Sequence, residues 1–94
     1  MINWLQDWYK NQCNDEWEHD YGITIGTLDN PGWDVKIDLI GTSLEGFEIP
    51  ITTTEISDDD WIMYRIENNT FIAAGDPGKL EKIILIFKQL FEAL

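Results

Sequence analysis

The chain has 94 residues, of which 18 are acidic and 6 are basic, so it carries a formal net charge of −12. A chain of this length forms one domain with a modest core, and its 44% of apolar residues is enough to fold it. The negative field repels nucleic acid and anionic membrane surfaces, so neither is an expected partner. It favours a basic partner, because opposite charge accelerates association. Acidity that only keeps the protein soluble is the alternative explanation.

The cysteine content and the N-terminus indicate the compartment. Cys13 is the single cysteine, so no intramolecular disulfide can form, which fits a reducing environment. The first ten residues show no basic segment followed by an apolar run, so no signal peptide is expected. The longest apolar run, residues 83–87, is too short to cross a bilayer. We therefore expect a cytoplasmic protein.

The first expected element is a short helix over residues 2–12. Trp4 and Trp8 are four residues apart, as are Leu5 and Tyr9, so all four lie on one face. A helix this short is marginal in isolation, so it has to dock on the rest of the domain. Its tryptophans are therefore expected in the core.

A polar break at residues 14–20 separates this helix from a hairpin. Apolar residues alternate with polar ones over 21–28 and again over 33–40, the period of strands with one buried face. The turn between them contains Pro31, which fixes φ, and Gly32, which can adopt positive φ. We expect an antiparallel hairpin here.

Three further strands are expected downstream. The strand over 47–56 is interrupted by Pro50, which cannot donate to a sheet ladder, so it should lie at an edge or contain a bulge. Strands over 61–67 and 70–74 are joined by two asparagines, which tolerate the left-handed region.

The last expected element is a helix that begins at Pro77, with Asp76 as its N-cap, and continues to the C-terminus. The element order α-β-β-β-β-β-α requires no parallel crossover. The predicted fold class is α+β: one domain over residues 1–94, with a five-stranded antiparallel meander sheet. The N-terminal and C-terminal helices should pack on one face and leave the other open.

One segment, NDEWEHDYG, concentrates acids around the single histidine. Its polar side chains include types that bind metals or exchange protons, but the chain offers no second histidine, zinc spacing or calcium loop. It also lacks a recognisable nucleophile motif or phosphate loop, so no catalytic residue, metal ligand or cofactor is assigned. A small enzyme or metal-binding module stays the alternative function, centred on Glu16, Glu18, His19 and Asp20.

The open face of the predicted sheet is the stronger functional signal. Trp61 would lie there beside three consecutive aspartates, an arrangement typical of an interface hot spot with an acidic rim. Two structural explanations compete: cross-strand charge pairs for the charged residues, and a covering loop, residues 41–47, for Trp61. The side chains expected on this face are Thr24, Asp34, Lys36, Asp38, Trp61, Met63 and Arg65.

Five stretches carry a resemblance to a known family: WLQDWY (4–9), Cys13, WEHDYG (17–22), LDNPGWDVKIDL (28–39) and DDDW (58–61). Together they resemble the immunity protein 53 family of bacterial polymorphic toxin systems. The resemblance implies a small cytoplasmic protein, encoded beside a secreted toxin, that neutralises the toxin by binding; it does not imply a catalytic role. Among the matching positions, only Glu18 and His19 lack an obvious packing role.

The sequence therefore predicts a stoichiometric inhibitor that occludes the basic active site of a cognate protein toxin. The oligomeric state stays open. The residues expected to bind the partner are Glu16, Glu18, His19, Asp20, Asp34, Asp38, Asp58, Asp59, Asp60 and Trp61.

Overall fold

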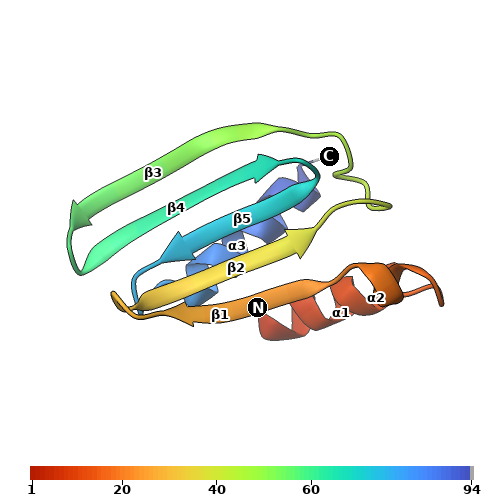
Figure 1. The fold of residues 1–94 in the computed structure, drawn as a ribbon, viewed down its shortest axis with the longest axis horizontal. Coiled ribbons are helices and arrows are strands. Elements are labelled where there is room, and N and C mark those ends of the chain that lie inside the picture. The colour runs from red at the N-terminus through yellow and green to blue at the C-terminus, as the bar shows by residue number, and fades with distance from the viewer. Residues whose placement is uncertain (94) are drawn as a thin grey trace.

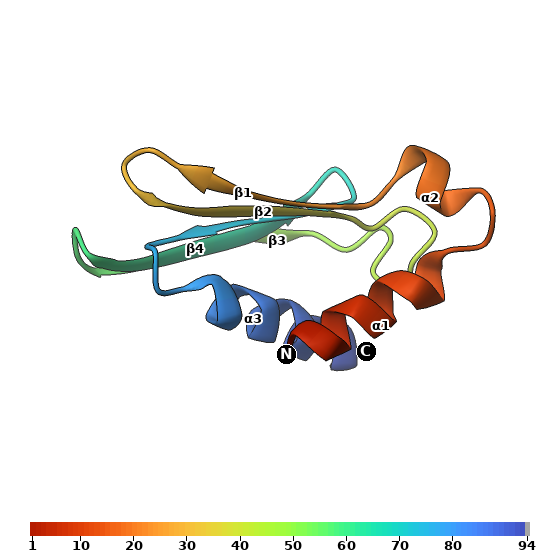
Figure 2. The same cartoon turned by 90° about the horizontal axis from the view of Figure 1, so that it is seen from below.

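The structure, a computed structural model, describes residues 1–93 and has two layers. One layer is a five-stranded sheet, and the other consists of two helices on the same face of that sheet (Figures 1 and 2). The predicted α+β class and the placement of both terminal helices on one face are confirmed. The elements are α1 Ile2–Gln12, α2 Trp17–Asp20, β1 Ile23–Leu28, β2 Gly32–Asp38, β3 Ile49–Ser57, β4 Asp60–Glu67, β5 Thr70–Gly75 and α3 Leu80–Glu92.

All neighbouring strands are antiparallel, in the order β1-β2-β5-β4-β3. The predicted meander holds within β1–β2 and within β3–β4–β5, but β2 pairs with β5 where a simple meander would pair it with β3. Burial explains the difference. Val35 of β2 and Phe71 of β5 are almost completely buried, as central strands require, whereas β3 is exposed along nearly its whole length. The connection after β2 therefore carries the chain to the far edge.

Strand β3 is an edge strand and is also irregular, so both alternatives predicted from Pro50 are realised. Its register with β4 shifts between Ile49 and Thr52, around the proline, and again between Glu55 and Ser57. At a bulge the missing N–H of proline does not cost a hydrogen bond of the sheet. Bulges in an edge strand also hinder its pairing with strands of other chains.

The core lies between the sheet and the two long helices, with Phe87 of α3 at its centre. Its ring centroid is 5.0 Å from that of Trp8 in α1 and 5.1 Å from that of Phe71 in β5. Leu5 and Trp8 are buried, which confirms that α1 docks through the predicted face, although Tyr9 at the end of that face is 37% exposed. Aromatic contacts such as these, edge-to-face for Trp8 and tilted for Phe71, add to the stabilisation from apolar burial.

The predicted start of the last helix is wrong by three residues. Helix α3 begins at Leu80, and Asp76, instead of capping it, is 4% exposed and bonded to other elements. Its carboxylate accepts hydrogen bonds from the amides of Trp61 and Gly78, at 2.9 and 2.8 Å, and from Lys79 Nζ at 2.6 Å. The bond from Lys79, followed by that from Trp61, lowers the pKa of Asp76 from 3.8 to about 2. Asp76 thus ties β4 to the turn before α3.

Candidate protein-binding surface

The ten residues expected to bind a partner do not form one patch. They fall into three groups, and the first and third lie at opposite ends of a molecule that measures 42 × 22 × 20 Å along its principal axes (Figure 1). The corner group, around α2, contains Glu16, Glu18, His19 and Asp20; the β2 group contains Asp34 and Asp38; the hairpin group, at the β3–β4 turn, contains Asp58, Asp59, Asp60 and Trp61.

In the corner group, Glu18 holds the chain in place. Its two carboxylate oxygens accept hydrogen bonds from the amides of Asn14 and Asp15, at 2.9 and 2.8 Å. Backbone amides, first its own and then these two, lower the pKa of Glu18 below its usual 4.5. The Asn14 side chain in turn accepts from the amides of Glu16 and Trp17. These bonds shape a short helix, α2, within the stretch predicted as a polar break.

Trp17 anchors the same corner in the core. It is 6% exposed, and its indole N–H donates to the Ile40 carbonyl oxygen at 2.7 Å. His19 and Asp20 are exposed, and neither side chain is hydrogen-bonded to residues 1–93. Within those residues, no group of three or more His, Cys, Asp or Glu side chains is arranged to hold a metal. The corner therefore has a clear structural role.

The face of the sheet opposite the helices matches the prediction, because the register aligns the expected side chains in rows. Asp34 of β2 lies opposite Ala74 of β5, which lies opposite Met63 of β4. The next row contains Lys36 and Arg65, separated by one residue of β5. These two bases therefore do not form the cross-strand pairs considered above; Arg65 contacts Glu67 on its own strand, at 3.6 Å. Asp38 accepts a hydrogen bond from the Gly22 amide.

Trp61 also lies on this open face, where it is half-buried, and its ring extends over the neighbouring strands. A Cβ at Gly32 would lie 3.3 Å from Cζ2 of the Trp61 ring and 2.5 Å from the Gly75 carbonyl oxygen, so only glycine fits beneath the ring. The proposed cover by residues 41–47 is wrong: a Cβ at Gly41 would approach Trp17, at the other end of the molecule. The face of Trp61 is free of that loop.

A hollow of about 480 Å³ surrounds Trp61. The sequence singled out Asp58, Trp61 and Met63 but not the other three lining residues, because the contributing segments are distant along the chain and only the fold brings them together. Glu55 is the cross-strand neighbour of Trp61, and Thr53 is that of Met63. The lining residues are Asn30, Thr53, Glu55, Asp58, Trp61 and Met63.

The three consecutive aspartates of the hairpin group differ in their surroundings. Asp60 forms an ion pair with Lys79 at 2.7 Å, and hydrogen bonds to Asp60 and then Asp76 raise the pKa of Lys79. The Asp59 amide donates to Ser57 Oγ within the turn. Asp58 is exposed and lines the hollow. Of the three, Asp58 is thus the one that lines the hollow with Trp61 and forms no ion pair within residues 1–93.

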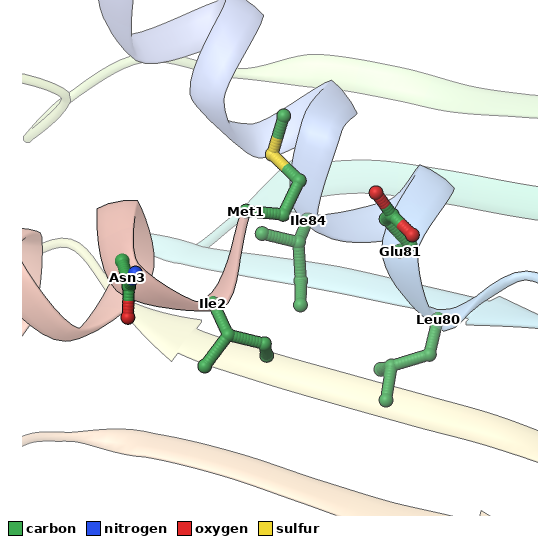
Figure 3. A pocket seen from close by; sticks show the side chains of 6 residues that line it. All are labelled: Met1, Ile2, Asn3, Leu80, Glu81 and Ile84. Atoms are coloured by element: carbon green, nitrogen blue, oxygen red, sulfur yellow. The ribbon is translucent and has the colours of Figure 1, made fainter.

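A second, more apolar groove lies on the helix side, between the start of α1 and the start of α3 (Figure 3). It measures about 500 Å³ and is lined by Met1, Ile2, Asn3, Leu80, Glu81 and Ile84. Ile2 is 59% exposed and also lines an adjacent groove between α1 and β1. The sequence did not predict this groove: Ile2 lies at the edge of the apolar face of α1, beside Leu5 and Tyr9 and away from the tryptophans.

The fold and these surfaces define a small acidic α+β binding domain with one uncovered sheet face. A family model described as immunity protein 53 matches residues 2–92, nearly the whole chain. The chain belongs to the immunity protein 53 family, as its sequence motifs indicated. Immunity proteins neutralise toxins and are generally not enzymes. No curated protein and no solved structure matches the chain. No helix within residues 1–93 combines the length and apolarity needed to cross a membrane.

Proposed function

We propose that this protein neutralises a cognate toxin in the cytoplasm by laying its open sheet face over a basic active site of that toxin. The observation that carries the proposal is the hollow on this face, where half-buried Trp61 and Met63 are flanked by acidic side chains. Central aromatic residues with a charged rim dominate the binding energy of many interfaces.

The charge on this face supports a basic partner. Asp34, Glu55 and Asp58 form no ion pair with any Lys or Arg of residues 1–93, so their charges are available to an incoming protein. Free surface carboxylates in a molecule with a net charge of −12 attract a cationic surface over a distance and raise the association rate. The same field disfavours binding to nucleic acid or anionic lipid.

The size of the face suits inhibition by steric occlusion. A standard interface buries about 800 Å² on each partner, a modest share of the 5872 Å² of accessible surface. One sheet face can therefore cover an active site without any chemical change to the toxin.

The proposal is tested by co-expressing the chain with the product of the adjacent gene and by measuring association at increasing salt. We expect rescue of growth, a 1:1 complex, and an association rate that falls with ionic strength while the dissociation rate changes little. Rescue without a stable complex would point to a catalytic mechanism and contradict the proposal. An association rate independent of salt would contradict the electrostatic part.

A further inference from the structure

The hollow around Trp61 is lined by apolar side chains, by carboxylates and by a side-chain amide. Trp61 and Met63 of β4 form its floor, and Glu55 stands beside Trp61 as its cross-strand neighbour on β3. Asp58, from the β3–β4 turn, and Asn30, from the β1–β2 turn, complete the rim. The Trp61 ring thus lies between the carboxylates of Glu55 and Asp58, on the β3 side, and the amide of Asn30, on the β2 side.

The carboxylates and the indole N–H of this hollow have no hydrogen-bond partner within residues 1–93. Glu55 and Asp58 are exposed, and their carboxylates accept no hydrogen bond and form no ion pair within residues 1–93. The indole N–H groups of Trp17 and Trp33 donate to carbonyl oxygens, but that of Trp61 has no acceptor in the described part of the chain. Two negative charges and a partly exposed indole ring therefore line the same hollow.

This combination matches a guanidinium group better than any neutral or anionic ligand. A flat delocalised cation stacks on an indole ring and, at the same time, donates paired hydrogen bonds from its edge to carboxylates. A lysine ammonium is a compact, strongly hydrated charge that gains less from stacking. The hollow, of about 480 Å³, is large enough for one such side chain.

We propose that the hollow formed by Trp61, Met63, Glu55, Asp58 and Asn30 binds one arginine side chain of the toxin. This inference rests on the proposed function and identifies the chemical group that the open face recognises. The arginine stacks on Trp61 and pairs with Glu55 and Asp58. An arginine in a basic active site would be both covered and neutralised by this contact.

The test uses the full chain and small probes, without the toxin. Amide nitrogen–proton NMR spectra show the indole signals of the five tryptophans, and a Trp61→Phe variant identifies the signal of Trp61. We titrate N-acetyl-arginine amide, N-acetyl-lysine amide and the uncharged isostere N-acetyl-citrulline amide. The arginine probe should shift the Trp61 signal with a dissociation constant on the order of 1–10 mM. The citrulline probe should leave it in place.

Two double variants that remove the same number of negative charges distinguish binding in the hollow from attraction by the net charge of the protein. Glu55→Gln/Asp58→Asn should weaken the arginine probe by about tenfold, whereas Glu16→Gln/Asp20→Asn, at the other end of the molecule, should not. No response of the Trp61 signal, or an equal response to lysine or citrulline amide, would overturn the arginine site. Rescue of growth in co-expression would be unaffected by that result, so the two proposals fail separately.

Discussion

The corner around α2 and the hairpin end of β3–β4 contain similar residues but differ in role. Each has a tryptophan, Trp17 or Trp61, within a run of acids, and they lie at opposite ends of the molecule. Trp17 is 6% exposed and donates to a carbonyl oxygen, and Glu18 beside it is bonded to backbone amides. Trp61 is half-buried on the open face, and its acidic neighbour Glu55 has no ion pair within residues 1–93.

This difference shows that composition does not separate a structural cluster from a binding one. Hydrogen-bonding groups that are satisfied within the chain stabilise the fold, because leaving them unpaired would cost free energy. Groups that stay free on an uncovered face add little to stability and remain available to a partner. Substitutions in the corner should therefore lower stability with little direct effect on toxin binding. Substitutions at the hairpin end should weaken toxin binding with little effect on stability.

The largest expected effect is on the stability of the corner. Trp17→Ala should lower the free energy of unfolding by about 3–5 kcal/mol, since it removes a buried ring and leaves a cavity. Trp61→Ala, at the surface, should lower it by about 1 kcal/mol or less. Urea denaturation of both variants measures the two values. Equal losses would mean that Trp61 is as much a part of the core as Trp17 and would remove the contrast between the two ends.

A smaller effect, dependent on pH, is expected at the junction between the hairpin and α3. The pKa of Asp76 is lowered from 3.8 to about 2 in the folded protein, so its ionised form stabilises the fold above pH 3.8. This stabilisation is lost as the pH falls from 3.8 towards about 2. In Asp76→Asn the group cannot titrate. The difference in urea midpoint between the wild type and this variant should therefore be largest near neutral pH and shrink over that interval.

The exposed Asp58 supplies the matched control for this pH profile. Asp58→Asn removes the same charge from a carboxylate without a hydrogen bond in residues 1–93 and should leave the profile nearly unchanged. A constant difference between the wild type and Asp76→Asn across the interval would show that the ion pair with Lys79 does not stabilise the ionised form.

Local sequence patterns predicted most of the fold. The spacing of Trp4 and Trp8 gave a helix with the observed bounds, and the alternation along β2 assigned Val35 and Lys36 to opposite faces as observed. Strand order was less accessible, because alternation specifies which face is buried but not which strands pair. The start of α3 was missed for a related reason: Asp76 is bonded to Trp61, fifteen residues earlier in the chain.

The candidate site was predictable only in part. Trp61 was identified because it occupies a position of the open face, and its acidic surroundings were visible in the sequence. Its cross-strand neighbour Glu55 was not identified, since the register that places Glu55 there belongs to an irregular edge strand with a shift next to this position. The acids of the corner group were expected to bind a partner, but the hydrogen bonds that Glu18 makes depend on a loop conformation that composition does not reveal.

The most direct test of the central claim compares the association rates of two charge-matched variants with the cognate toxin. Glu55→Gln/Asp58→Asn at the hairpin end and Glu16→Gln/Asp20→Asn at the corner remove the same two charges from exposed positions. The hairpin variant should associate about 3- to 10-fold more slowly at low salt, with an unchanged urea midpoint. The corner variant should associate at nearly the wild-type rate. A slower corner variant beside an unaffected hairpin variant would contradict the account and place the toxin at the α2 corner.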